Sequence, residues 1–256
     1  MFTANLFSRK SPALDDINWR FEYKYQLTMP QYLAVKSAIL PNMALDEYTK
    51  AVPDNRYFVR SLYFDSFFFD AFHDKADGNC DRLKLRIRTY VDSPDNIEIL
   101  KAEIKVRKDV TTEKYVAQIN YADYLSFMDD QHWPGDKLSN EVLTEFERYY
   151  HQKTLVPIVL VQYEREGYRA RTKEEIRITF DHHVRSARAD GLFPENPIFR
   201  VHTPGSIILE IKCNKMQPEW LRRLIRDYGL TIISNSKYVQ GVIVSHPSVV
   251  TPSWSA

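Results

Sequence analysis

With 256 residues, 35 Lys and Arg and 34 Asp and Glu, the chain is long enough for one large domain or two small ones, and its balanced charge disfavours a globally basic nucleic-acid-binding protein. Its two cysteines exclude a disulfide framework and a four-cysteine zinc site, and fit a reducing compartment. Glycine occurs only 7 times and no glycine-rich phosphate-binding motif is present, so any bound phosphate must be held by side chains.

Period-two alternation of apolar and polar residues dominates the chain and predicts β-strands joined by helices. The candidate strands are residues 19–27, 57–65, 82–91, 97–107, 111–119, 157–165, 175–181 and 207–213. The turn-forming sequence Ser-Pro-Asp-Asn at residues 93–96 predicts a hairpin of the third and fourth strands.

Helix starts are indicated by residues that can cap a first turn or begin one. They are Thr28, Ser66, Asn120, Asn140 and the pair Gln217-Pro218. The last of these helices should stop at Gly229, and a final short helix or strand should follow near Tyr238.

We expect one domain over residues 19–246, between a flexible N-terminal segment, 1–18, and a flexible tail, 247–256. The N-terminus lacks the apolar region of a secretory signal, and no stretch approaches about 18 consecutive apolar residues. The expected protein is therefore soluble and cytoplasmic, with no membrane span.

The polar faces of the predicted strands are strongly basic, because successive side chains of a strand point to opposite faces. Their basic members are Arg20, Lys24, Arg82, Lys84, Arg86, Arg88, Lys101, Lys105, Arg107, Arg165, Arg177 and Lys212. Their acidic members are Glu22, Glu103, Glu175, Asp181 and Glu210. The chain as a whole is nearly neutral, so positive charge is concentrated on the sheet.

Two architectures explain this pattern. One is an antiparallel sheet with one face in water. The other is an α+β fold in which eight antiparallel strands form a barrel with a basic lumen and flanking helices cover its apolar outer face. We favour the barrel, because the four cations at alternate positions from Arg82 to Arg88 repel one another unless an anion neutralises them. Such a lumen should bind a polyanion, with a divalent metal on its carboxylates.

Other charged motifs carry less weight. His182 and His183 are adjacent on a strand and face opposite ways, so we do not assign them to one metal ion. Glu22 and Glu103 are either additional metal ligands or ion-pair partners of lumen cations. The arginines of the helix after Pro218 fit a solvated helix face.

The ordered set of short motifs resembles the catalytic domain of the vacuolar transporter chaperone (VTC) polyphosphate polymerases, within the triphosphate tunnel metalloenzyme (CYTH-like) superfamily. The resembling segments lie at residues 20–25, 61–65, 83–88, 103–105, 163–165, 177–181, 209–212 and 236–238. The superfamily's N-terminal Glu-x-Glu-x-Lys appears here as Arg20-x-Glu22-x-Lys24, which leaves one fewer carboxylate for metal.

The resemblance implies an eight-stranded tunnel and a phosphotransferase that adds the terminal phosphoryl group of ATP to a growing polyphosphate chain, with Mn²⁺ or Mg²⁺. We expect this tunnel to be open at both ends. Its implied catalytic phosphate contacts are Lys24, Arg86, Arg88, Lys105, Arg165, Arg177 and Lys237. Tyr163 matches a tunnel-wall residue and Glu210 the metal-coordinating glutamate. Glu22, Lys84 and Lys212, which share the same faces, complete the expected substrate-binding set.

Two other functions stay open at this stage. One is a metal-dependent triphosphatase with water as the nucleophile, and the other is a polyphosphate-binding module without activity. The expected ligands are ATP and triphosphate or polyphosphate, with no nucleic acid. The sequence leaves open a separate membrane partner and the oligomeric state.

Overall fold

The computed structural model describes residues 21–97, 99–108 and 111–250. Eight strands follow one another in a single antiparallel sheet, in the order β1-β10-β8-β7-β3-β4-β5-β6. They are β1 (Phe21–Leu27), β3 (Tyr57–Ser66), β4 (Arg82–Thr89), β5 (Leu100–Lys108), β6 (Thr111–Ile119), β7 (Leu155–Ala170), β8 (Ile176–Arg188) and β10 (Ile207–Cys213). Two short strands, β2 (Met43–Leu45) and β9 (Arg200–Val201), pair with β7 and β8.

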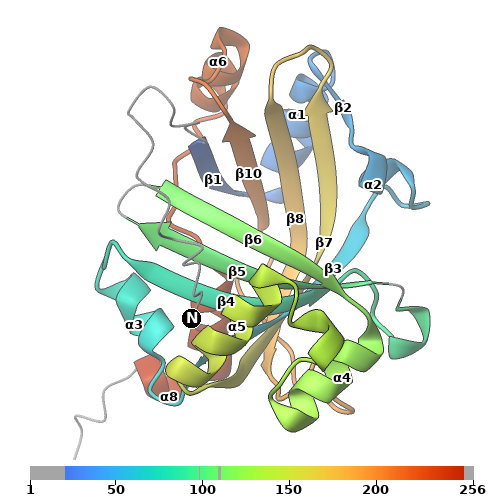
Figure 1. Ribbon diagram of the computed structural model, residues 1–256. Coiled ribbons are helices and arrows are strands. Elements are labelled where there is room, and N and C mark those ends of the chain that lie inside the picture. Colours follow the sequence, from blue (N-terminus) through green and yellow to red (C-terminus); the bar gives the residue numbers. More distant parts are fainter. Residues whose placement is uncertain (1–20, 98, 109–110, 251–256) are drawn as a thin grey trace, which may run out of the picture.

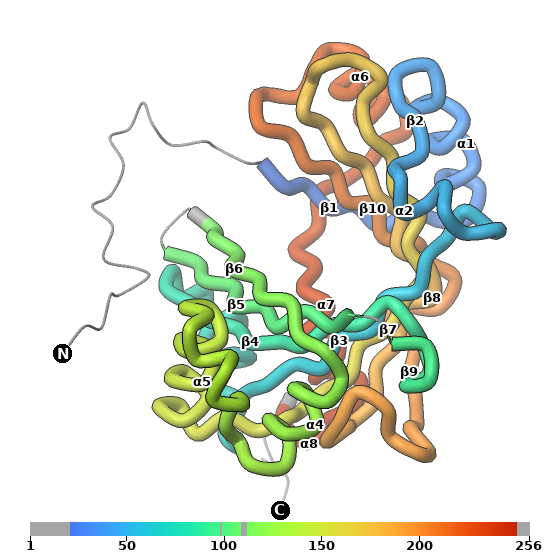
Figure 2. The backbone as a smooth tube through the Cα atoms, turned by 45° about the vertical axis from the view of Figure 1, so that its right-hand side comes forward, coloured from blue at the N-terminus to red at the C-terminus, as the bar shows by residue number. Residues whose placement is uncertain are grey.

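The sheet curves into an incomplete barrel (Figures 1 and 2). Its edge strands are β1 and β6, and no ladder joins them in the described part of the chain. The α+β class and the eight antiparallel strands are as predicted. The two long strands β7 and β8 exceed their predicted lengths, and the other predicted strands agree to within three residues.

Helices cover the outer face of the sheet at both ends of its path (Figure 1). One pair, α1 (Met29–Ile39) and α6 (Glu219–Asp227), packs on β1, β8 and β10. A second pair, α4 (Tyr121–Asp130) and α5 (Glu141–Gln152), packs on β4, β5 and β6. Thr28, Asn120 and Asn140 cap their helices as predicted. The remaining short helices are α2 (Glu47–Lys50), α3 (Asp70–Ala76), η2 (Pro94–Asn96) and η3 (Gly135–Lys137).

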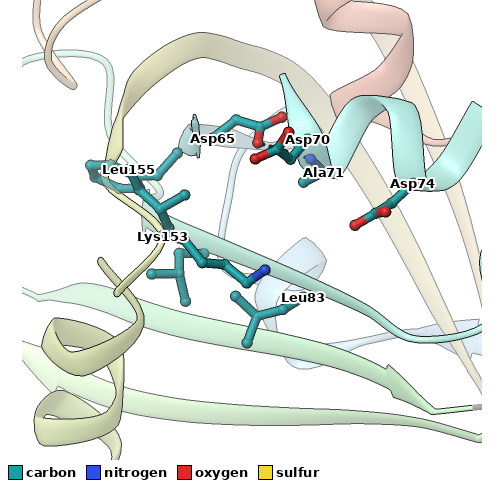
Figure 3. Close-up of a pocket in the computed structure, with 9 residues that line it drawn as sticks. Asp65, Asp70, Ala71, Asp74, Leu83, Lys153 and Leu155 are labelled. Atoms are coloured by element: carbon teal, nitrogen blue, oxygen red, sulfur yellow. Dashed lines mark hydrogen bonds between the residues drawn. The ribbon is translucent and has the colours of Figure 1, made fainter. Parts of the chain in front are cut away.

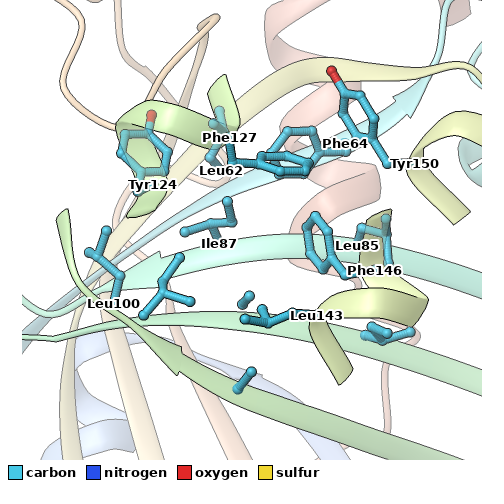
Figure 4. Packing of buried hydrophobic residues seen from close by; sticks show 14 of the residues in the cluster. Leu62, Phe64, Leu85, Ile87, Leu100, Tyr124, Phe127, Leu143, Phe146 and Tyr150 are labelled. Carbon is cyan, nitrogen blue, oxygen red and sulfur yellow. The ribbon is translucent and has the colours of Figure 1, made fainter. Parts of the chain in front are cut away.

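The apolar core under α4 and α5 shows why the alternation predicted the faces correctly. Leu85 and Ile87 of β4 are fully buried there, together with Phe127 and Phe146 of the covering helices (Figure 4). The intervening side chains of β4 must therefore lie on the concave side of the sheet. The hollow, as we call this concave side, thus receives Lys84, Arg86 and Arg88.

Helix α3 begins later than predicted. Ser66 is the last residue of β3, and the cap position is Phe69, in a left-handed conformation with φ 60°. The Asp65 carboxylate instead accepts hydrogen bonds from the main-chain N–H groups of Ser66, Ala71 and Phe72, at 2.8, 2.9 and 3.1 Å. An acidic side chain at the end of the strand therefore holds the first turn of the helix.

Helix α7 (Lys237–Ser245) lies inside the hollow, not outside the sheet (Figure 2). Tyr238 and Val242 pack on Val159 and Val161 of β7. Close approach is possible because position 241 is glycine; a Cβ there would meet Ser186 Oγ at 2.9 Å. An apolar helix therefore covers part of the concave face. The passage open at both ends stays a prediction.

The ends of the chain are only partly described. Trp19, Arg20 and the predicted flexible segment 1–18 lie outside the described residues, as do residues 251–256. Residues 247–250, expected in the flexible tail, form the short helix α8 (Pro247–Val250) because Val249 packs beside α7. Within the described ranges no helix is long and apolar enough to cross a membrane.

The core under α5 gives a stability prediction. Phe146→Ala removes a fully buried ring that meets Phe64 edge-on with centroids 5.8 Å apart. The free energy of unfolding, measured by urea denaturation, should fall by about 3–5 kcal/mol. The exposed Leu125→Ala on α4 is the control and should change it by less than about 0.5 kcal/mol. Equal losses in the two variants would contradict this assignment of the core.

Candidate functional site: two charged walls facing across the hollow

The site consists of two groups of charged side chains on opposite parts of the concave face. We call the first the carboxylate wall; it comes from β1, β7, β8 and β10 and contains Glu22, Lys24, Arg165, Asp181, Glu210 and Lys212. We call the second the cation wall; it comes from β4, β5 and β6 and contains Lys84, Arg86, Arg88, Glu103, Lys105 and Lys114.

A carboxylate pair forms the centre of the carboxylate wall. In the β1–β10 register Lys24 lies opposite Glu210, and Glu22 lies opposite Lys212. The Lys212 ammonium contacts both acids, at 2.8 Å from Glu210 and 3.7 Å from Glu22. Burial opposes ionisation of Glu210, but Lys212, Lys24 and Arg165 outweigh it and hold its pKa well below the ordinary value. Both carboxylates are therefore charged at neutral pH, with a cation between them.

The other acid of this wall, Asp181, is fully buried and binds two cations. Arg165 donates two hydrogen bonds to its carboxylate, at 2.6 and 2.8 Å, and Lys237 of α7 forms a close ion pair with it. Burial alone would raise the pKa of Asp181, but the two cations lower it to about 2. Arg165 and Lys237 also lie over the Tyr163 ring, 5.1 and 4.7 Å from its centroid. Strands β7 and β8 and helix α7 therefore bring together three predicted site residues, Tyr163, Arg165 and Lys237, with Asp181, which was not predicted for the site.

Arg177 lies at the end of this wall. One of its terminal nitrogens donates to Asp46 at 2.9 Å and to the Tyr57 hydroxyl at 3.2 Å. Its Nε and the Thr179 hydroxyl are buried with no hydrogen-bond partner. Both residues line a cavity of about 10 Å³ with Arg165, Glu210 and Lys212. Buried polar groups nearly always have a hydrogen-bond partner. The unpaired Arg177 Nε and Thr179 hydroxyl therefore indicate a place for a polar ligand or ordered water.

The cation wall carries a single described carboxylate for several cations. Glu103 accepts two hydrogen bonds from Arg86, lies 3.8 Å from Arg88 and 3.6 Å from Lys114, and is almost fully buried. Burial opposes its charge, but Arg86 and Arg88 prevail and lower the pKa of Glu103 to about 2. Of the two roles expected for Glu103, these contacts fit the ion-pair partner of lumen cations.

Two lysines of this wall, Lys84 and Lys105, form no close ion pair with a described residue. Lys84 and Lys105 lie directly opposite each other on β4 and β5, and neither has an ion pair within 4.0 Å in the described part of the chain. The Lys84 amine lies over the face of the Tyr238 ring, 4.5 Å from its centroid. Burial lowers the pKa of Lys84 to about 7, and burial also lowers the pKa of Lys105. The fold thus holds two amines where charge is unfavourable unless an anion is present.

The two walls face each other across the hollow. The charge of Glu22 on β1 raises the pKa of Lys105 on β5, while Lys24 and Lys212 act in the opposite direction. Strands β1 and β5 are not neighbours in the sheet, so this coupling reflects its curvature. All twelve residues predicted for the site lie on the concave face or, for Lys237, at the start of the helix inside it.

Several residues of the site were not predicted. Lys114 continues the cation wall onto β6, Asp46 holds Arg177, and Tyr63 and Ser61 accept hydrogen bonds from Arg86 and Arg88. For Lys114, the alternation of polar and apolar residues over 112–118 is too weak to predict on which face of the sheet the side chain lies. Asp46 precedes a four-residue helix 131 positions from Arg177, and no local pattern connects the two.

A second cavity, of about 20 Å³, lies outside the hollow at the start of α3 (Figure 3). Asp65, Asp70 and Asp74 line one side of it, and Leu83 and Lys153 line the other. That volume suits about one water molecule and its acidic lining repels phosphate. The histidine pair of β8 is also separate: His182 is buried beside Glu166, and His183 is exposed beside Glu164.

Comparison with known proteins identifies the family of the chain. A family model for the VTC domain matches residues 19–246. The chain belongs to the VTC domain family. This confirms the resemblance to the VTC family that the short motifs carry.

Solved structures with similar folds include a putative adenylate cyclase from Bacillus halodurans, with a TM-score of 0.48 and 13% identity over 86% of this chain and 94% of that one. Another is a putative adenylate cyclase from Vibrio parahaemolyticus, with a TM-score of 0.46 and 12% identity over 87% and 97%. No curated protein matches the chain. At such low identity the activity of neither structure transfers to this VTC domain protein.

The unusual state of Lys84 gives a prediction. At pH 8 an amine with a pKa of about 7 is mostly neutral, and a bound polyphosphate favours its charged form, so binding should take up protons. Titration calorimetry with tripolyphosphate in two buffers of different ionisation heat measures this uptake. We expect a smaller uptake in Lys84→Met than in the wild type. The exposed Arg222→Ala should match the wild type, and identical uptake in wild type and Lys84→Met would contradict the role of Lys84.

Proposed function

We propose that the protein is an ATP-dependent polyphosphate polymerase whose chemistry takes place between the two walls of the hollow. The observation that carries the proposal is a pair of amines without an ion pair, Lys84 and Lys105, on the wall that faces the carboxylate pair Glu22 and Glu210. A linear polyanion lying between the walls would neutralise the first group. The second group is suited to a divalent cation that such an anion brings with it.

The donor set fits Mn²⁺ or Mg²⁺. Both ions prefer oxygen ligands, and Glu22 and Glu210 are two ionised carboxylates close enough to share one ammonium group. The chain has no third carboxylate at position 20, in keeping with a metal held partly by phosphate oxygens. When bound, the metal would neutralise charge on the phosphates and on the departing ADP.

The residues of the hollow supply positioning and charge. In the proposed step the bond between the β–γ bridging oxygen and the γ-phosphorus of ATP breaks, a terminal oxygen of the acceptor chain bonds to that phosphorus, and ADP leaves with the electron pair. Arg86, Arg88 and Arg165 present planar guanidinium groups that can grip phosphate oxygens at two points. Lys24, Lys105 and Lys237 add compact charges, and Arg177 offers the unsatisfied Nε.

The same hollow is compatible with water as the acceptor. Helix α7 covers the concave face of β7 and β8 with apolar side chains, which shortens the charged part of the hollow. A triphosphatase needs room for a short substrate only, so this observation favours it as the second candidate. Incubation of the pure protein with ATP and Mn²⁺ separates the two, since a polymerase yields long acid-labile phosphate chains on a gel and a triphosphatase yields inorganic phosphate alone. Binding without any turnover would leave a polyphosphate-binding module.

The role of Glu210 can be tested with its amide. Glu210→Gln should lower metal-dependent turnover about 100-fold or more, because charge stabilisation by a bound metal is worth several kcal/mol. Binding of polyphosphate should persist, since every cation remains. Glu219→Gln on the exposed face of α6 is the matched control. Unchanged activity of Glu210→Gln would remove Glu210 from the site.

Lys105 allows a cleaner test of phosphate binding than the arginines, because it has no ion pair to lose. Lys105→Met should weaken polyphosphate binding about tenfold or more, and should reduce the salt dependence of binding by about one contact. Without ligand, the variant should be at least as stable as the wild type in urea. If Lys105→Met binds polyphosphate as tightly as the wild type, the cation wall is not the phosphate-binding site. The same holds if the variant is destabilised enough to explain its weaker binding.

A further inference from the structure

A cluster of two histidines and a glutamate lies outside the hollow, where α4 is joined to α5. His132 follows the end of α4, and Glu147 and His151 lie four positions apart on α5 and so share one face of that helix. One ligand atom from each residue lies within 4.8 Å of those of the other two. No other group of three such residues with this spacing occurs in the described ranges.

The backbone brings these residues together. Gln131, the residue that ends α4, adopts a left-handed conformation with φ 62°, which turns the chain back over α5. The next residue, His132, then places Nδ1 2.8 Å from Oε1 of Glu147, and its ring stacks on that of His151 with centroids 4.7 Å apart. The turn therefore presents a second imidazole to a helix face that already carries a carboxylate and a histidine.

The surroundings orient each group. The main-chain N–H of Trp133 donates to the other Glu147 oxygen, Oε2, at 2.7 Å, which leaves Oε1 directed toward His132. His151 Nε2 lies 2.9 Å from the carbonyl oxygen of Gln131, so this nitrogen carries the proton and the other ring nitrogen keeps its lone pair. Metal-bound histidines commonly make this kind of hydrogen bond to a carbonyl, which fixes their tautomer.

We propose that His132, Glu147 and His151 form a binding site for a divalent transition-metal ion, best suited to Zn²⁺. Two imidazoles and one carboxylate are a known zinc ligand set that leaves a fourth position for water. Tetrahedral zinc requires ligand atoms about 3.3 Å apart, and the exposed rings can close this distance by rotating. Imidazole ligands favour Zn²⁺ over Mg²⁺ and Mn²⁺, so this site differs in kind from the all-carboxylate pair of the hollow.

Zinc bound here would tie the turn at residues 131–133 to α5. Both helices cover the outer face of β4, β5 and β6, so the site is separated from the hollow by the sheet and its core. The proposal does not depend on the function proposed for the hollow. Its expected consequence is structural: Zn²⁺ should raise the melting temperature, because it binds the folded arrangement and not the unfolded chain.

Titration calorimetry with Zn²⁺ on the untagged full-length chain tests this site, with the exposed thiol removed by Cys80→Ser. We expect one zinc site in this parent, and a loss of affinity of about 10-fold to 100-fold or more in His132→Gln and in His151→Gln. Quenching of Trp133 fluorescence by Cu²⁺ gives a second readout beside the ligands. Mg²⁺ should produce neither effect.

Two matched variants separate the outcomes. His183→Gln removes an exposed histidine that also has a carboxylate partner, Glu164 at 3.3 Å, and should bind zinc like the parent. Glu210→Gln alters the hollow and should also leave this zinc site intact. The proposal is overturned if His132→Gln and His151→Gln retain the parent affinity, or if Glu210→Gln alone abolishes zinc binding.

Discussion

Repulsion among the cations of two neighbouring strands, β4 and β5, is the constraint on which the structure of the hollow depends. The alternation of β4 and β5 places Lys84, Arg86, Arg88 and Lys105 on one small area, and Glu103 is the acid that the described chain offers them there. The sheet can hold this arrangement because the apolar side chains between the cations are buried under α4 and α5. Packing energy on one face thus maintains unfavourable electrostatics on the other.

The walls differ in how far their charges are satisfied. In the carboxylate wall each described cation has an acid within reach, as Arg165 has Asp181 and Lys212 has Glu210. In the cation wall two lysines remain without one. An incoming phosphate chain would therefore meet the unpaired amines of Lys84 and Lys105 first. It would meet existing ion pairs at Arg86 and Arg88, which contact Glu103, and along the carboxylate wall. Binding in this order costs less free energy than breaking a buried ion pair at every phosphate contact.

The sequence was sufficient for the faces of the strands, because alternation is a local property. It could thus assign Arg86, Lys105 and Glu210 to the polar faces of their strands before any pairing was known. It also found most helix starts, since capping depends on a few adjacent residues. The start of α3 was predicted wrongly, because the carboxylate of Asp65, one residue before the expected cap Ser66, holds the first turn.

Contacts between distant segments account for the rest. The position of α7 inside the hollow depends on Gly241 meeting β7 and β8, and the Arg177 contact depends on Asp46 far along the chain. Neither leaves a periodic signal. The resemblance to the VTC family supplied the order of the motifs. The division of the concave face into a carboxylate wall and a cation wall is visible only in the folded structure.

The most direct measurement of this account is a crystal structure with tripolyphosphate and Mn²⁺. The account predicts phosphate density between the walls, in contact with Lys105 on one side and Lys24 or Arg165 on the other, and manganese beside Glu210. Phosphate bound only on the outer surface of the sheet, with Lys84 and Lys105 still without an anion, would contradict it.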